Sequence, residues 1–232
     1  MEENKIFNLT PYIDFFLPRF CPSCNKKLLE TERCICNECF STIIRADEKR
    51  LNSEFDRKFA SSNIISDFTS LFVFEKDKAL QSFIHSIKYN NRFLNAKFLG
   101  SLVGNKLGKQ IKDWNINLII PVPLHHLKKA ERGYNQSEFI VKGLSKKLKI
   151  PHTTRVLKRV RYTETQTAFN LAEREKNISN AFKVRSKKKI IGKTILVIDD
   201  VITTGSTIKE CGKALLEGDA KSVYACSVAV AD

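Results

Sequence analysis

The chain has 232 residues, of which 42% are hydrophobic, and it carries 40 Lys and Arg residues against 25 Asp and Glu residues. A chain of this length can bury the core of one domain and a small additional module. The sequence has no run of 18 apolar residues, so we expect no membrane span. Its acidic start, Met-Glu-Glu, is not typical of a signal peptide, and we therefore expect a cytoplasmic protein.

The positive charge is unevenly distributed along the chain. Residues 121–193 contain 19 Lys and Arg residues against 5 Asp and Glu residues, whereas residues 194–232 carry more acidic than basic side chains. A concentrated basic segment attracts phosphate groups, either of a small substrate or of a nucleic acid backbone. The alternative is that these lysines serve only to keep the chain soluble.

Five of the seven cysteines lie close together near the start of the chain. Two Cys-x2-Cys knuckles, separated by 11 residues, are formed by Cys21, Cys24, Cys36 and Cys39. Four thiolates satisfy tetrahedral Zn²⁺, and no His or carboxylate is placed to leave an open coordination position. The pattern therefore predicts a structural zinc ion that stabilises a module too small to build its own core.

The remaining cysteines need a separate explanation. Cys34 is assigned as a spare thiol, although it could replace Cys36 as a ligand through a less usual spacing. An iron–sulfur cluster is the alternative to zinc, but the ligands of such clusters are usually more widely spread. Cys211 and Cys226 fall in apolar patterns and are expected to be core residues. We assign residues 1–60 to a zinc-ribbon module with its linker.

Strands and helices alternate through the rest of the chain, residues 61–232, after a polar linker or small helical connection at 41–67. Strands are predicted at 68–74, 118–122, 154–160, 182–185, 195–198 and 222–230, and helices at 77–88, 95–112, 136–148 and 208–217. This alternation predicts an α/β domain whose mostly parallel sheet is covered by helices on both faces. Ligands of such sheets bind beyond the carboxyl ends of the strands.

A basic loop follows the predicted strand at 118–122. It contains Arg132, whose forked guanidinium suits a phosphate or pyrophosphate. His125 and His126 in the same loop could act as acid–base groups, but loop histidines are more often simply exposed. Lys88 on the helix at 77–88 could reach a pyrophosphate, or could be a solvated lysine on an amphipathic helix.

The stretch 195–207 carries the clearest chemical signal. An apolar strand is followed by the adjacent carboxylates Asp199 and Asp200, and then by a small hydroxylated loop before a helix. Loop N–H groups and a helix N-terminus hold phosphate, while carboxylates accept hydrogen bonds from vicinal hydroxyls. The alternative is a buried strand followed by a helix capped by Ser206 or Thr207, which leaves the two carboxylates unexplained.

This stretch resembles the phosphoribosyl-pyrophosphate (PRPP) loop of type I phosphoribosyltransferases. The resemblance implies that Asp199 and Asp200 hold the ribose hydroxyls, and that the loop wraps the 5′-phosphate through Thr203, Thr204, Gly205, Ser206 and Thr207. It also implies that Mg²⁺ accompanies PRPP, and that Arg132 and Lys88 neutralise the leaving pyrophosphate. The catalytic set under this reading is Asp199, Asp200 and Arg132.

The order of motifs along the chain also resembles the ComF family of competence proteins. The matching residues are Cys21, Cys24, Cys36, Cys39, Lys88, Tyr89, Pro121 to Pro123, Arg132 to Gln136, Gln166, Arg174, Asn177 and Phe182. Family members more often have Arg directly after the Lys-Tyr pair, whereas Asn90 and Asn91 intervene here before Arg92. The resemblance implies a part in DNA uptake and natural transformation, with single-stranded DNA and a DNA-uptake helicase machinery as partners.

Three functions follow from these observations. The first is a PRPP-binding, phosphoribosyltransferase-like protein that acts in DNA uptake. The alternative is an active phosphoribosyltransferase of nucleotide metabolism with an unidentified acceptor. A third reading, a zinc-ribbon interaction protein with a degenerate pocket, is disfavoured by the intact run from Asp199 to Thr207.

Overall fold

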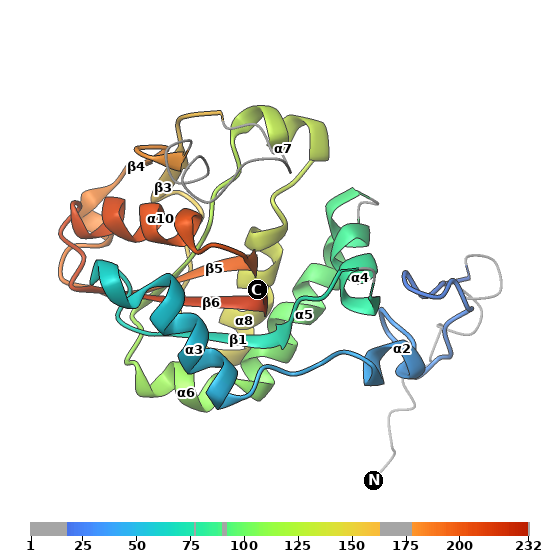
Figure 1. The fold of residues 1–232 in the computed structure, drawn as a ribbon. Helices are drawn as coiled ribbons and strands as arrows, with labels where there is room; N and C mark the ends of the chain where they lie inside the picture. Colours follow the sequence, from blue (N-terminus) through green and yellow to red (C-terminus); the bar gives the residue numbers. More distant parts are fainter. Residues whose placement is uncertain (1–17, 77, 90–91, 163–177, 232) are drawn as a thin grey trace, which may run out of the picture.

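A four-stranded parallel sheet forms the centre of the computed structural model, which describes residues 18–76, 78–89, 92–162 and 178–231. The strand order is β1-β6-β5-β2. The strands are β1 (Phe68–Val73), β2 (Leu118–Pro121), β5 (Thr194–Ile202) and β6 (Ser222–Val230). Figure 1 shows helices on both sides of this sheet, so the predicted α/β fold with a mostly parallel sheet is confirmed.

The described helices and the smaller sheet complete the fold. The helices are α2 (Asn37–Ser41), α3 (Glu48–Lys58), α4 (Ala79–Tyr89), α5 (Phe93–Lys106), α6 (Gly108–Asp113), α7 (His126–Arg132), α8 (Gln136–Leu148) and α10 (Ser206–Leu216), with 3₁₀ turns η1 (Ala60–Ser62) and η2 (Lys187–Lys189). β3 (Leu157–Arg159) and β4 (Phe182–Val184) pair antiparallel as a separate two-stranded sheet. No helix within the described ranges combines the length and the apolar character needed to cross a bilayer.

The central sheet is apolar on both faces. Successive side chains of a strand point to opposite faces, so a continuous apolar run covers both. In β5, Leu196 and Ile198 belong to the apolar cluster that includes α4, α5 and α8, while Ile195 and Val197 face the cluster that includes α10. All four side chains are at most 1% exposed. The continuous apolar run in the sequence therefore reflects burial on both sides rather than a half-exposed strand.

Several predicted boundaries differ from the structure. β5 continues to Ile202, so Asp199 and Asp200 lie within the strand rather than after it. The stretch 95–112, predicted as one helix, forms α5 and α6 with a break at Leu107. The short helix α7 was not predicted, because its seven residues show too little apolar periodicity.

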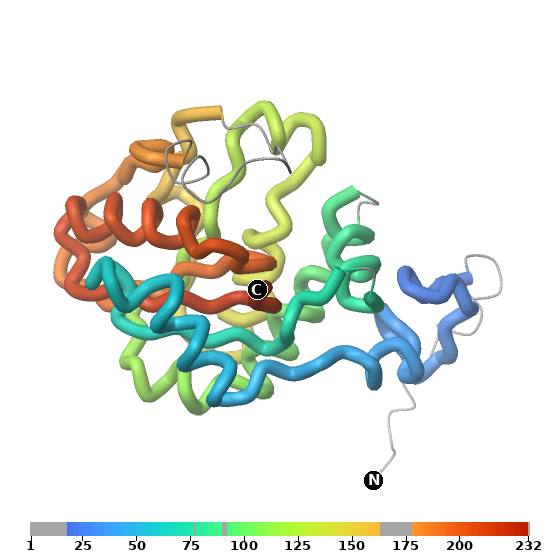
Figure 2. The backbone as a smooth tube through the Cα atoms, viewed as in Figure 1, coloured from blue at the N-terminus to red at the C-terminus, as the bar shows by residue number. Residues whose placement is uncertain are grey.

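The cysteine-containing segment lies beside α4 and apart from the central sheet (Figure 2). Its buried residues Cys21, Leu28 and Ile35 join the same apolar cluster as Leu80 and Phe83 of α4. The segment is therefore packed against the α/β domain through side chains as well as connected to it by the chain.

Candidate functional site

The two adjacent carboxylates of β5 are held by different partners. Asp199 Oδ1 accepts hydrogen bonds from the Ser137 hydroxyl at 3.0 Å and from the backbone N–H of Asp200 at 2.9 Å. Asp200 Oδ2 forms an ion pair with Lys88 Nζ at 2.8 Å, and its Oδ1 accepts from the Val201 N–H at 2.9 Å. The pair is thus tied to α4 and to the start of α8, which are far apart in sequence.

These contacts separate the acidities of the two carboxyl groups. Burial, together with the neighbouring charge of Asp200, raises the pKa of Asp199 to about 7. Burial acts in the same direction on Asp200, but the charge and hydrogen bond of Lys88 outweigh it and lower the pKa of Asp200. Burial would lower the pKa of Lys88, and the Asp200 charge reverses this and raises it. The arrangement therefore keeps Asp200 and Lys88 charged at neutral pH.

The loop after β5 brings the N-terminus of α10 toward the acidic pair. Gly205 is the N-cap residue, with a left-handed φ of 77°, and it supplies no side chain to cap the first turn. A Cβ at this position would lie 2.8 Å from Cε1 of Phe59, so the loop packs closely on the end of α3. Thr204 Oγ1 and Ser206 Oγ are hydrogen-bonded at 2.8 Å. The Ser206 N–H donates to Thr204 Oγ1 at 3.3 Å, so the N-terminus of α10 can offer its remaining first-turn N–H groups to an anion.

The basic loop is anchored by its own central residues. The Tyr134 hydroxyl donates a hydrogen bond to the carbonyl of Ile87, next to Lys88. The Asn135 side-chain N–H donates to the Val122 carbonyl at 2.9 Å, and its Oδ1 accepts from the Ser137 N–H at 3.1 Å, which caps α8. The segment Arg-Gly-Tyr-Asn-Gln therefore connects the ends of α4, β2 and α8.

Arg132 is oriented by two neighbours. Its guanidinium donates to the side-chain oxygen of Gln136, and its Cζ lies 5.4 Å from the centre of the Tyr89 ring. Gly133, with a φ of 81°, ends α7 and turns the chain back toward α8. These contacts hold the positive charge of Arg132 near Lys88.

Most of these groups line one cavity of about 430 Å³, which we call the acidic cavity after Asp199 and Asp200. Its described lining is Lys88, Tyr89, Val122, Leu124, Lys128, Arg132, Gln136, Ser137, Arg159, Asp199, Asp200 and Thr207. Five residues singled out from the sequence thus meet in one place: Lys88, Arg132, Asp199, Asp200 and Thr207. Thr203, Thr204, Gly205 and Ser206 are not among the described lining residues; the first three form the turn before α10, and Ser206 is the first residue of that helix.

A second cavity of about 350 Å³ adjoins the first and shares Lys88, Tyr89, Lys128 and Arg132 with it. The shared residues include three cations, and Glu131 in the second cavity adds a third carboxylate to Asp199 and Asp200. Such a site suits a ligand that carries both vicinal hydroxyls and phosphate groups.

Sequence reasoning missed Arg159 and Ser137. Arg159 ends β3 and reaches the cavity from the small sheet; its Cζ lies 5.5 Å from the Phe182 ring, and burial lowers its pKa. Its only sequence signal is a place in a basic stretch with many similar residues. Ser137 had no signal beyond its place after Asn135, because its bond to Asp199 spans 62 residues.

His125 does not behave as a simple exposed loop residue. Its side chain is 5% exposed, its Nδ1 accepts from the Leu127 N–H at 3.4 Å at the start of α7, and burial lowers its pKa. Its ring lies 4.1 Å from that of His126. His125 is outside the described lining of the acidic cavity, and its contacts explain it as part of the loop structure.

The predicted zinc ligands converge. Sγ atoms of Cys21, Cys24, Cys36 and Cys39 all lie within 4.8 Å of one another, with 3.6 Å between Cys24 and Cys36. Tetrahedral Zn–S bonds of about 2.3 Å place sulfur atoms about 3.8 Å apart, so the four thiols fit a zinc ion. The Cys39 N–H donates to Cys36 Sγ at 3.4 Å, as expected for a thiolate knuckle.

Cys34 lies outside this group of four. It is buried, and burial raises the pKa of its thiol to about 11. The geometry therefore favours Cys36 over Cys34 in the metal-binding set.

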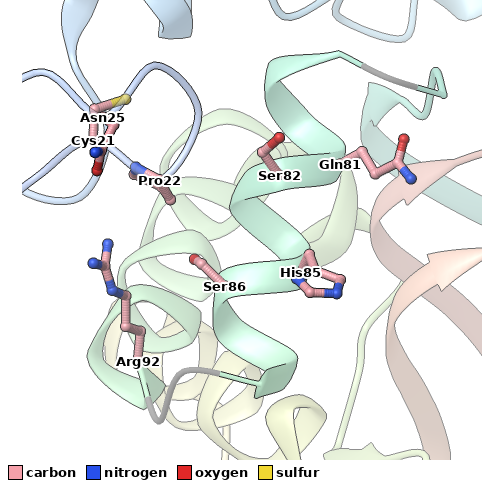
Figure 3. A pocket seen from close by; sticks show the side chains of 8 residues that line it. All are labelled: Cys21, Pro22, Asn25, Gln81, Ser82, His85, Ser86 and Arg92. Atoms are coloured by element: carbon pink, nitrogen blue, oxygen red, sulfur yellow. The ribbon is translucent and has the colours of Figure 1, made fainter.

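A larger cavity, of about 540 Å³, is lined by residues of the first knuckle and of α4. Figure 3 shows Arg92 pointing from the start of α5 toward Cys21 and Pro22, while Ser82 and Ser86 of α4 face the same gap. Arg92 also donates to the Phe20 carbonyl at 3.1 Å, which connects the start of α5 to the cysteine module.

Some residues of the family resemblance cannot be placed. Gln166, Arg174 and Asn177 lie outside the described residues, as do Asn90 and Asn91. Lys88, Tyr89, the segment Arg132 to Gln136 and Phe182 are described and lie as reported above.

A parallel sheet with an acidic pair, a glycine turn and a helix N-terminus at one cavity defines a phosphoribosyltransferase-type domain. Residues 134–231 match the family model described as a phosphoribosyl transferase domain. The chain also resembles the structure titled glutamine PRPP amidotransferase from B. subtilis complexed with ADP and GMP. That likeness has 20% identity and a TM-score of 0.39, and covers 57% of this chain and 26% of the other.

The curated relatives name a narrower group. Competence protein F of Haemophilus influenzae is 36% identical over 59% of this chain and 61% of its own length. DNA utilization protein YhgH of Escherichia coli K12 is 31% identical over 62% and 64% of the two chains, and Competence protein ComFC of Streptococcus pneumoniae is 26% identical over 87% and 90%. The chain thus spans somewhat less than two thirds of the first two. These relatives and the matched domain bear out the resemblance to the ComF family of competence proteins.

Proposed function

We propose that this protein binds PRPP, or a related sugar phosphate, and acts with single-stranded DNA in DNA uptake during natural transformation, in the cytoplasm and alongside a DNA-uptake helicase machinery. The observation that carries the ligand assignment is the cavity in which Asp199, Asp200 and Thr207 lie together with Lys88 and Arg132. The relatives named for competence and DNA utilization support the biological part of the proposal.

The cavity suits the parts of PRPP in the following way. Asp199 and Asp200 accept hydrogen bonds from the ribose hydroxyls, and the N-terminus of α10 with Thr207 holds the 5′-phosphate. Lys88 and Arg132 neutralise the pyrophosphate. Since Lys88 pairs with Asp200, its charge must be divided between the carboxylate and the pyrophosphate when PRPP binds.

Two metals belong to the proposal. Zinc held by Cys21, Cys24, Cys36 and Cys39 stabilises the N-terminal module. Mg²⁺ bound with PRPP supplies charge neutralisation at the pyrophosphate, and the carboxylates Asp199 and Asp200 are oxygen donors of the kind that it prefers.

The second candidate function is an active phosphoribosyltransferase with an unidentified acceptor. The same residues would then position the ribose and stabilise the departing pyrophosphate in an oxocarbenium-like transition state. Arg159 favours this candidate, because it brings a cation to the cavity from the small sheet, separately from the groups assigned to PRPP.

Calorimetric titration with PRPP and Mg²⁺ tests the ligand assignment. The double variant Asp199→Asn with Asp200→Asn should lose PRPP binding while keeping its folded circular dichroism spectrum. Unchanged affinity of the folded double variant for PRPP would contradict the assignment of the two aspartates to the ribose. A pyrophosphate-release assay across candidate acceptors, including single-stranded DNA, then separates the two candidates: turnover supports the enzyme, and binding without turnover supports the accessory protein.

A further inference from the structure

An apolar groove of about 340 Å³ lies between the cysteine module and the start of α5. Its lining is Pro18, Arg19, Phe20, Leu28, Arg33, Cys34, Arg92, Phe93, Leu94 and Asn95. The floor is buried, with Leu28 4% exposed and Cys34 9% exposed, whereas Phe20 and Phe93 remain 40% and 41% exposed on its walls. The groove is separate from the acidic cavity and shares no described lining residue with it.

The walls of the groove are fixed by hydrogen bonds between distant segments. Arg92 Nη1 donates to the Phe20 carbonyl at 3.1 Å, which links the start of α5 to the cysteine module. Arg19 Nη1 donates to the Glu32 carbonyl at 2.8 Å, which links the two sides of that module. The Phe93 ring lies 5.0 Å from that of Phe139 on α8. The groove is therefore preformed, which reduces the entropic cost of binding.

The charged side chains in the described lining of the groove are all positive. Three guanidinium groups, from Arg19, Arg33 and Arg92, line it, and none of its described lining residues is Asp or Glu. Guanidinium groups bind carboxylates through paired hydrogen bonds. Arg19 and Arg92 already donate to backbone carbonyls, so the exposed Arg33 is the guanidinium assigned to a carboxylate. An apolar floor with this rim is complementary to a segment that carries apolar side chains beside a carboxylate.

We propose that this groove binds a short acidic and apolar peptide segment of a partner protein. Its volume is at the lower end of the roughly 300–1,000 Å³ typical of ligand pockets, so it admits a few large side chains rather than a folded domain. Aliphatic Leu28 and Leu94 and a buried thiol suit an inserted aliphatic or aromatic side chain. Single-stranded nucleic acid binds through bases stacked on open aromatic faces, whereas the buried floor of this groove is formed by aliphatic Leu28 and the thiol of Cys34.

The test selects short random peptides displayed on phage against the zinc-loaded 232-residue chain, with counter-selection against Leu94→Glu. Leu94 is 64% exposed in the first turn of α5, where a glutamate is compatible with the helix, so the variant should fold. Enriched peptides should carry Asp or Glu beside Leu or Phe. Fluorescence anisotropy should show that Leu94→Glu weakens the best peptide about tenfold or more.

Matched variants separate the groove from the general surface. Leu29→Glu replaces an equally exposed leucine outside the lining and should leave peptide affinity unchanged. Arg33→Glu should weaken binding, whereas Lys27→Glu in the same module should not. PRPP binding should be equal in all four variants, so a failure of the peptide-binding proposal can be distinguished from a failure of the PRPP assignment.

Four results would overturn the proposal. One is that no peptide is enriched. Another is that the enriched peptides bind Leu94→Glu as well as they bind the unmodified chain. The third is that a labelled oligo(dT), rather than the peptide, loses affinity in Leu94→Glu, which would reassign the groove to nucleic acid. A peptide of residues 1–17 of the chain that binds more tightly than any selected one would assign the groove to the chain itself.

Discussion

At the scale of single residues, two adjacent aspartates differ because their partners differ. Asp200 is paired with Lys88, while Asp199 accepts, within the described part of the chain, from two neutral donors, the Ser137 hydroxyl and the Asp200 N–H. Burial therefore raises the pKa of Asp199 from the ordinary 3.8 of an aspartate to about 7, and the folded protein retains a proton on this carboxyl until the pH approaches that value. The stability that this proton confers is lost as pH rises toward and through 7.

Asp199→Asn should remove this pH dependence. The free energy of unfolding of the unmodified protein should fall between pH 5 and pH 8 by an additional amount on the order of 1–3 kcal/mol relative to the variant. Urea unfolding at the two pH values measures the difference. Asp200→Asn provides the contrast, since it leaves Lys88 without its carboxylate and should lower stability at both pH values. Parallel pH profiles for Asp199→Asn and the unmodified protein would contradict the assignment.

Gly205 should be intolerant of any side chain. Ala at this position meets both a φ of 77° and a Phe59 ring atom 2.8 Å from the new Cβ. Gly205→Ala should therefore cost more than the roughly 1 kcal/mol of conformational strain alone, and should weaken PRPP binding because the turn moves. Thermal unfolding and calorimetry measure the two effects.

Gly192 offers the matched control for this substitution. It has a similar φ of 66°, but nothing lies within 4 Å of its potential Cβ. Gly192→Ala should show the conformational cost alone, with unchanged PRPP affinity. Equal losses of stability in the two variants would mean that contact with Phe59 is unimportant.

At the scale of elements, the two C-x2-C knuckles form one unit with α4. Cys21, Leu28 and Ile35 share an apolar cluster with Leu80 and Phe83, so loss of the metal should expose apolar surface on α4 as well. The elements of the module are short, with α2 only five residues long, and the module depends on the cross-link that four thiolates provide.

Cys21→Ser should lose bound zinc, whereas Cys34→Ser should retain it. The reason is geometric: Cys21 belongs to the converging group of four, and Cys34 does not. Elemental analysis of the two purified proteins gives zinc per chain, and thermal unfolding should show a lower midpoint for Cys21→Ser. Unchanged zinc in Cys21→Ser would exclude that ligand, and loss of zinc in Cys34→Ser would reopen the choice between Cys34 and Cys36.

At the scale of the whole molecule, the basic excess of residues 121–193 is divided between two environments. Some of it, including Lys128, Arg132 and Arg159, lines the acidic cavity, while Lys187, Lys188 and Lys189 form an exposed 3₁₀ turn. Lys187 is partly engaged, because its Nζ donates to the Glu217 carbonyl at 3.2 Å. The basic segment is therefore not a single surface.

Replacing Lys187, Lys188 and Lys189 together with Ala should weaken binding of single-stranded DNA and reduce the salt slope of log Kd by up to about 2. Fluorescence anisotropy with oligo(dT) at several salt concentrations measures the slope. The control replaces the exposed Lys106, Lys109 and Lys112, which lie outside the basic segment and should leave the slope unchanged. Equal slopes for both triple variants would indicate that the turn serves only solubility.

The division between residues 1–60 and 61–232 stays a prediction. Phe59, on the N-terminal side of that division, is fully buried in the apolar cluster that contains Phe68 and Val197. The boundary was predicted from composition, in a polar stretch. Composition gives no sign that the Phe59 ring packs against Gly205, 146 positions further along the chain.

The sequence by itself determined the features that short spacing encodes. The alternation of predicted strands with predicted helices indicated the α/β sheet, two Cys-x2-Cys pairs indicated the metal centre, and the run from Asp199 to Thr207 indicated a phosphate-binding turn, because each depends on residues that are neighbours in the chain. Tertiary structure alone decided that Lys88 pairs with Asp200, that Ser137 binds Asp199 and that Arg159 reaches the cavity. These contacts join segments tens of residues apart, and the charge and burial that they set are properties of packing rather than of spacing.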